Sequence, residues 1–217
     1  MRKFLYAVAV AATALFTATM MAGSASAATA VLTWTNSSGG AVSGTLSPDS
    51  GSATFNSTSG SSGVSCSSSS FSADVTANGS SSATESLTTQ TFTNCTPHGL
   101  FCVNSIGAVA VDNLPFTSTV SSGGATTLAP GTKGPIQTTV TVNSCLGQIK
   151  CVYQATNGSL SGQAHNGTKA DNSDNSLTFT NQPFSLVSGP TSVCINPANF
   201  SATYNGIHGS GGYVYTN

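Results

Sequence analysis

The sequence predicts an all-β protein: an antiparallel β-sandwich, immunoglobulin-like or jelly-roll-like, stabilised by disulfide bonds. The chain of 217 residues contains 36 Ser, 31 Thr and 23 Gly, and all three are poor helix formers. Beyond the N-terminal segment, apolar and polar residues alternate in short runs that Gly, Asn, Ser or Pro interrupt, which is typical of half-buried strands. The six cysteines, an even number, indicate a disulfide framework.

The alternation of apolar and polar residues predicts where each strand lies in the sequence. Strands are expected near residues 30–35, 41–46, 52–56, 71–77, 83–92, 103–111 and 116–120, and then near 136–142, 151–155, 159–164, 177–180, 184–187, 200–204 and 213–216. Asn-Gly pairs at 78–79, 157–158 and 205–206 suit hairpin turns, because such turns require positive φ. The serine-rich stretch 57–70 is expected to be a surface loop.

The N-terminus has the three parts of a secretory signal peptide. Arg2 and Lys3 precede an apolar run from Phe4 to Met21, and small residues follow at Ala25 and Ala27. This pattern predicts export with cleavage after Ala27. A membrane anchor is the alternative, since the run is nearly long enough to span a bilayer.

The remaining residues, 28–217, are expected to form a single β-sandwich domain with an approximate internal two-fold repeat. Cys66 precedes Phe71-Ser72-Ala73, and Cys194 similarly precedes Phe200-Ser201-Ala202. The Gly- and Pro-containing segment 121–135 is the best linker candidate. The alternative is therefore two small β domains, 28–120 and 136–217, joined by that linker.

Part of the first half resembles a known family. The run Cys66…Phe71-Ser72…Thr76-Ala77-Asn78-Gly79-Ser80…Ser86-Leu87-Thr88…Phe92, followed by Cys95 and Cys102, is similar to neocarzinostatin-type apoproteins. These are small exported immunoglobulin-like sandwiches that hold an apolar chromophore in a cleft. The resemblance implies a local Cys95–Cys102 disulfide and an apolar ligand. The chain as a whole resembles the Ser/Thr/Gly-rich exported β proteins of unknown function found in actinobacteria, which implies a fold and a compartment.

The six cysteines allow two main pairing schemes. In the local scheme, Cys95–Cys102 and Cys145–Cys151 close small loops and Cys66–Cys194 joins the halves. In the nested scheme the pairs are Cys66–Cys95, Cys145–Cys194 and Cys102–Cys151. A tight hairpin satisfies the geometry of a local bridge. The matching Phe-Ser-Ala segments instead favour pairing within each half, so we expect the nested scheme.

The charge balance excludes several classes of function. Only 5% of residues are charged, against about 25% in an ordinary soluble domain. Cleavage of the signal would leave Lys133, Lys150 and Lys169 against six acids, a net charge of −3. Nucleic-acid binding is not expected, because it requires basic residues to neutralise phosphates, and neither is membrane association after cleavage.

Candidate sites are few. Asp171 and Asp174 could supply oxygen ligands to calcium, although the glycine and distal glutamate of an EF-hand loop are missing. A solvated turn is the alternative. The strand aromatics are expected in the core, whereas Trp34, Tyr213 and Tyr215, near the two ends of the domain, are possible binding aromatics. No cofactor site is recognised.

The function expected first is therefore that of a secreted, non-catalytic extracellular protein with a structural or interaction role, self-associating or binding an extracellular protein or glycan. The first alternative is a binding module for an apolar small molecule or a glycan. The second is a hydrolase of unrecognised type, although no Gly-x-Ser-x-Gly motif occurs. His98, His165 and His208 are expected to be solvated loop residues.

Overall fold

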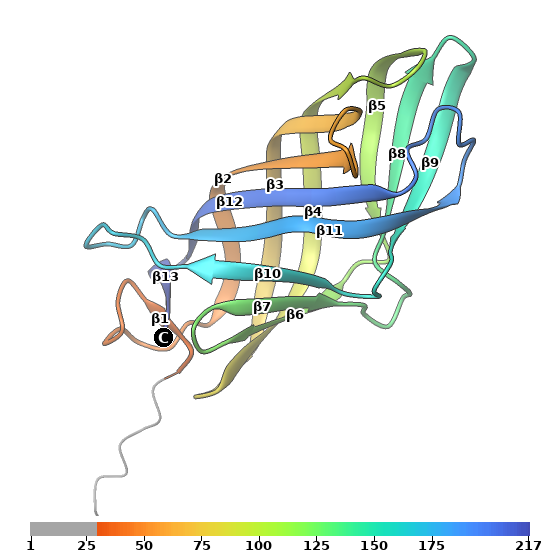
Figure 1. Ribbon diagram of the computed structural model, residues 1–217. Helices are drawn as coiled ribbons and strands as arrows, with labels where there is room; N and C mark the ends of the chain where they lie inside the picture. Colours follow the sequence, from red (N-terminus) through yellow and green to blue (C-terminus); the bar gives the residue numbers. More distant parts are fainter. Residues whose placement is uncertain (1–29) are drawn as a thin grey trace, which may run out of the picture.

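The computed structural model describes residues 30–217, and this part of the chain forms antiparallel strands and no helix (Figure 1). The expected signal peptide, residues 1–27, lies outside the described residues. The strands are β1 (Leu32–Trp34), β2 (Gly44–Ser57), β3 (Gly63–Asn78), β4 (Ser82–His98), β5 (Val103–Asp112), β6 (Phe116–Ser121), β7 (Ala125–Ala129), β8 (Gln137–Ser144), β9 (Gly147–Ala155), β10 (Leu160–His165), β11 (Ser176–Ser188), β12 (Ala198–Gly209) and β13 (Gly212–Thr216).

The all-β, antiparallel prediction is confirmed, but the sheet closes into an eight-stranded barrel where a sandwich was expected. The strands of the closed part follow the order β12-β2-β3-β4-β6-β7-β10-β11, and β11 pairs again with β12. Closure depends on β12, which pairs with β2 along one edge and with β11 along the other. These eight strands therefore form one closed ring, whereas a sandwich consists of two separate packed sheets.

A second group of strands, β9, β8 and β5, branches from the barrel at one end of β11. Residues 176–179 of β11 pair with β10, whereas residues 184–188 pair with β9. The change of partner coincides with an irregularity between Phe179 and Gln182, where Asn181 has φ 49°. A bulge bends its strand and increases the local twist. These strands lie at the upper right of Figure 1, where residues of β5 and β8 help to enclose the interior of the barrel.

Several predicted loops and turns belong to strands. The expected linker, residues 121–135, contains β7, whose Thr126 and Leu128 are buried. The serine-rich stretch 57–70 is a short turn followed by the first half of β3. Gly206 adopts a φ of 64° within β12, where a hairpin turn was expected. Both halves of the chain thus contribute strands to one sheet.

The disulfides are Cys66–Cys95, Cys102–Cys145 and Cys151–Cys194. The first is as expected in the nested scheme and joins facing residues of β3 and β4. The expected Cys102–Cys151 and Cys145–Cys194 bridges are wrong, and so is the local Cys95–Cys102 bridge that the resemblance implied.

Strand register explains these corrections. Val103 pairs with Ser144 across β5 and β8, so the preceding Cys102 meets the following Cys145, with their Cα atoms 5.5 Å apart. Cys151 lies within β9, opposite Val140, and the segment between β11 and β12 brings Cys194 to it. The Cα separations of these two bridges, 5.5 and 5.6 Å, lie within the range that a disulfide requires.

Asparagine side chains fasten β1 and β13 across the lower end of the barrel. Asn175 donates to the carbonyls of Ile207 and Val214, at 2.9 and 2.7 Å, and accepts from the Ile207 N–H. Asn166 bonds both the N–H and the carbonyl of Thr216, and Asn78 does the same for Leu32. An amide carries both a donor and an acceptor, so these side chains replace the missing neighbouring strand.

Candidate functional site: an apolar cavity in the barrel

The interior of the barrel is not completely filled. A cavity between the side chains leaves about 100 Å³ open to the centres of water-sized molecules, several times the roughly 10–15 Å³ that one water needs by this measure. An eight-stranded barrel is at the size where side chains either fill the interior or leave room for one small ligand. Here small residues, Ala53 and Ala73, lie at inward positions beside large rings.

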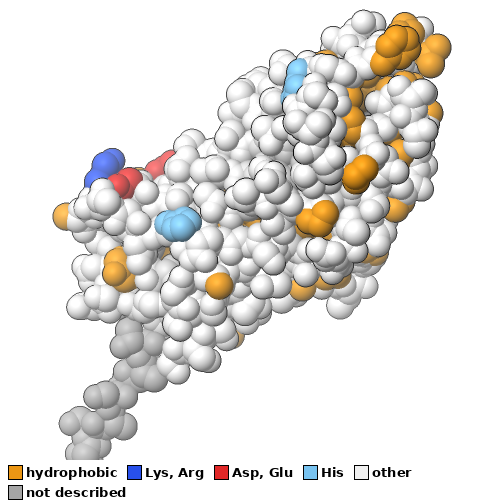
Figure 2. All heavy atoms as spheres, in the orientation of Figure 1, with side chains coloured by type: hydrophobic (Ala, Val, Ile, Leu, Met, Phe, Trp, Pro, Cys, Tyr) orange, Lys and Arg blue, Asp and Glu red, His pale blue; other side chains and the backbone are white. Residues whose placement is uncertain are grey.

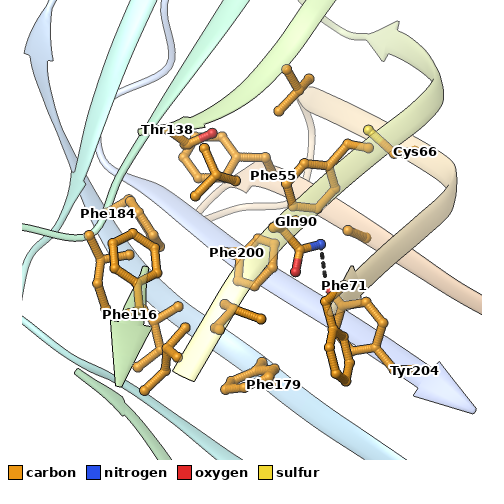
Figure 3. Close-up of a pocket in the computed structure, with 18 of the residues that line it drawn as sticks. Phe55, Cys66, Phe71, Gln90, Phe116, Thr138, Phe179, Phe184, Phe200 and Tyr204 are labelled. Carbon is orange, nitrogen blue, oxygen red and sulfur yellow. Dashed lines mark hydrogen bonds between the residues drawn. The ribbon is translucent and has the colours of Figure 1, made fainter. Parts of the chain in front are cut away.

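The cavity wall is almost entirely apolar and largely aromatic (Figure 3). Phe55 packs edge-to-face on Phe184, with ring centroids 5.4 Å apart, and Phe184 packs similarly on Phe200 at 6.2 Å. Phe92 extends this row from β4, again 6.2 Å from Phe200. Edge-to-face pairs are favourable arrangements of aromatic rings. The row therefore forms a preorganised apolar surface contributed by four different strands.

A small polar network lies at one side of this wall. The Gln90 Nε2 donates to the Tyr204 hydroxyl at 3.0 Å and to the Ser69 hydroxyl at 2.9 Å, and the two hydroxyls are 3.1 Å apart. Figure 3 shows the bond between Gln90 and Tyr204 beside the Phe71 ring. Burial raises the pKa of Tyr204, although its hydrogen bonds to Ser69 and Gln90 act in the other direction. Tyr204 therefore stays neutral and holds Gln90 in place.

Glu85 places an acidic side chain in the interior of the barrel. It lies on β4 opposite Ser118 of β6, and it lines both the main cavity and a smaller one of about 40 Å³ below it. Among the described residues that line these two cavities, no other is an acid and none is Lys or Arg. Desolvation raises the pKa of Glu85, and a hydrogen bond from Ser118 offsets only part of this effect. The carboxyl thus lies in surroundings that disfavour its charge.

Among residues 30–217, no backbone hydrogen bonds join β4 to β5, the two strands that form this part of the cavity wall. β4 pairs with β6 only through residues 82–87, so residues 88–98 have a strand partner only on the β3 side. β5 pairs with β8 and is the last strand of the sheet. No backbone ladder joins β4 to β5 in the described part of the chain, yet Phe92 of β4 and Val109 of β5 both line the cavity. The cavity is partly open to solvent, and these two edges are the place where its wall lacks backbone pairing.

The proposed calcium ligands serve as turn caps. The Asp174 carboxylate accepts from the N–H groups of Thr168 and Lys169, both at 3.0 Å, and from the Thr168 hydroxyl. These bonds lower the pKa of Asp174 to about 2. Asp171 accepts from the Ser173 N–H, which lowers its pKa as well. The described residues contain no cluster of three or more His, Cys, Asp or Glu side chains that could hold a metal ion.

The three aromatics singled out as possible binding residues lie on the β1–β13 pair and line neither cavity. The Trp34 indole covers the turn before β13 so closely that a methyl group added at Gly211 would lie 2.4 Å from its Cε2 atom. Tyr213 donates to Asp49 at 2.9 Å. Tyr215 is half-buried opposite Thr33. The structure therefore places them at the closed end of the barrel.

The histidines form no recognisable catalytic group in the described part of the chain. The His208 Nδ1 lies 3.4 Å from an Asp49 oxygen, and both side chains are partly exposed. A hydrolytic triad would also require a hydroxyl bonded to this ring, whereas His208 contacts Asp49, the Gly206 carbonyl and the Tyr213 ring. His165 borders the lower cavity, and His98 ends β4.

The outer surface is dominated by uncharged polar groups (Figure 2). Hydrophobic side chains gather at the end that carries β5, β8 and β9, where Phe101 and Leu146 are 78% and 73% exposed. The Cys102–Cys145 disulfide joins the β4–β5 loop, which carries Phe101, to the β8–β9 turn, which carries Leu146. Residues 30–217 include no helix of the length and hydrophobicity needed to cross a membrane.

The strand aromatics that line the cavity have the pattern of core residues in the sequence, which selects neither Glu85 nor Gln90 as a site residue. The available signal was the alternation in β4, where Ala83, Glu85 and Leu87 point inward. Residues two apart on a strand face the same side, so an acid between two inward-facing apolar residues also points into the core. No family model matches the chain, and neither the curated proteins nor the solved structures contain a significant match.

Proposed function

We propose that this protein is an exported, non-catalytic binding module that holds a small apolar molecule inside its barrel. The observation that carries the proposal is the aromatic cavity. A packed structural protein would gain stability by filling this space, because voids forfeit dispersion contacts among their lining atoms. The structural or interaction role that was expected first explains the hydroxyl-rich surface, but it does not explain the hollow interior.

The line between β4 and β5 provides the entry route. Two strands without a shared ladder can separate without breaking backbone hydrogen bonds, whereas opening any paired strands would cost several. The side chains on both sides of this line, among them Phe92, Val109 and Val111, are half-buried and line the cavity. A ligand that enters here reaches the Phe184–Phe200 row directly.

Export is part of the proposal. Three disulfides are typical of extracellular proteins, and the N-terminal segment has the composition of a signal peptide. A barrel cross-linked in this way would keep its shape around a cavity that contributes little packing energy.

The test uses N-phenyl-1-naphthylamine, a neutral probe whose fluorescence rises in apolar surroundings. At ~0.3 kcal/mol per non-hydrogen atom, a probe of about 17 such atoms binds with about 5 kcal/mol, a Kd on the order of 0.1 mM. Titrating the secreted, oxidised protein into a fixed probe concentration should therefore give a saturable rise. No saturation at protein concentrations up to about 1 mM would overturn the proposal.

Two variants of β5 make the test specific. Val109→Trp puts a large ring at an inward, half-buried position, whereas Ala110→Trp puts the same ring at the next position, which is exposed and lines neither cavity. Circular dichroism would establish that both fold. We expect Val109→Trp to weaken binding about tenfold or more and Ala110→Trp to leave it unchanged. Equal effects of the two substitutions would show that the probe binds elsewhere.

A further inference from the structure

We propose that the ligand carries a basic amine, and that Glu85 is the residue that binds it while the rings hold the apolar body of the ligand. This inference rests on the proposed function, because it concerns the same cavity.

Glu85 is placed for such a role. It lines both cavities, and so do Phe71 and Leu177, so its carboxyl lies where the upper and lower spaces meet. The other members of its inward row on β4, Ala83 and Leu87, are buried and apolar. A ligand in the upper cavity therefore meets one acidic group at the floor of a largely apolar chamber.

The polar contacts of Glu85 within the barrel are few. Ser118 supplies the side-chain hydrogen bond that stabilises its charged form, and a carboxylate can accept about four hydrogen bonds. An ionised carboxylate with so little compensation costs free energy in the empty barrel. Burial accordingly raises its pKa. A cationic amine would supply both the missing donors and the opposite charge.

The other titratable groups near these cavities do not offer the same contact. Tyr204 is engaged with Ser69 and Gln90. Cys66 is in a disulfide. His165 lies at an exposed position and borders only the lower cavity. None of these competes with Glu85 for a cation, and no Lys or Arg among the described lining residues neutralises it.

The test compares three naphthalenes of nearly equal shape at neutral pH: 1-naphthylmethylamine, 1-naphthalenemethanol and 1-naphthoic acid. Each displaces N-phenyl-1-naphthylamine from the oxidised protein. We expect the amine to bind about tenfold more tightly than the alcohol, because opposite charges attract strongly in apolar surroundings, and the acid to bind most weakly. Equal affinities of amine and alcohol would overturn this inference and leave the proposed function intact. Failure of all three to bind would instead contradict the proposed function.

Glu85→Gln identifies the residue responsible. This variant should bind the alcohol as well as the unmodified protein does, and should bind the amine no better than the alcohol. Asp74→Asn is the matched control, because it also removes one negative charge from the barrel, but Asp74 lines neither cavity and contacts Thr45. Asp74→Asn should keep the preference for the amine. Loss of that preference in both variants would assign it to net charge and contradict a specific contact with Glu85.

Discussion

Replacing Asn175 by alanine should destabilise the closed end of the barrel more than any single hydrogen bond would suggest. Asn175 is 3% exposed. Its side chain holds the N–H and the carbonyl of Ile207 and the carbonyl of Val214. Alanine would leave the N–H and the carbonyl of Ile207 without their side-chain partner in a largely buried place, whereas the Val214 carbonyl would keep its hydrogen bond from Asn172.

The size of the effect follows from these contacts. An unpaired buried polar group costs about 1–3 kcal/mol. Asn175 borders the small lower cavity, where water can partly replace the amide, so the lower end of the range applies. Two groups at about 1 kcal/mol each give a loss of about 2 kcal/mol, or ~4–8 °C in Tm for a domain of this size.

Chemical denaturation of the oxidised protein, followed by circular dichroism, measures this loss. The control is Asn104→Ala, because Asn104 is an exposed residue of β5 whose side chain forms no hydrogen bond within the described part of the chain; this substitution should change stability by less than about 0.5 kcal/mol. Hydrogen exchange of the Ile207 amide should also accelerate in Asn175→Ala. If Asn175→Ala were no less stable than Asn104→Ala, the asparagine contacts would not hold β13 in place.

Three further predictions concern covalent structure, pH and packing. Peptide mapping without reduction should yield fragments joined through Cys102–Cys145 and Cys151–Cys194; a fragment joining Cys102 to Cys151 would refute the register of β5 and β8. Because burial raises the pKa of Glu85 above its usual 4.5, its contribution to stability is fully present below pH 4.5 and is lost as the pH rises through the folded-state pKa. The stability of Glu85→Gln relative to the unmodified protein should therefore increase with pH over that interval in urea denaturation, and a constant difference would contradict the burial of this carboxyl. Gly211→Ala should displace the indole of Trp34, the single tryptophan of the chain, and shift its fluorescence to longer wavelength; Gly79→Ala, where the added methyl meets only Ser82 O at 3.5 Å, should leave the spectrum unchanged.

Local patterning predicted the strands well because inward and outward residues alternate within each one. β6 shows this clearly, with Phe116, Ser118 and Val120 buried and Thr117 exposed. Local turn signals were less reliable. Pro48 to Gly51 suggested a break, yet β2 continues through them because β12 pairs alongside. β11 likewise continues past Asn181, which accommodates the bulge with a positive φ.

The closure of the barrel and two of the disulfides depend on contacts between distant segments. The pairing of β12 with β2 joins residues near the two ends of the described chain, and nothing in either strand alone specifies it. The same holds for Cys102 and Cys145, which meet only because β5 and β8 are neighbours. The cavity was equally hidden, because Phe55, Phe184 and Phe200 have the pattern of core residues whether or not the space between them is filled.

The most direct test of an apolar ligand site inside the barrel is methyl NMR of the oxidised protein during titration with 1-naphthalenemethanol. We predict ring-current shifts for methyl groups that line the cavity, including those of Val109, Val140 and Leu128. The methyl groups of Leu146 and Val187, which are exposed on the outer surface, should not shift. Shifts confined to Leu146 and Val187 would show that apolar molecules bind the outside of the protein and would contradict a ligand site in the barrel.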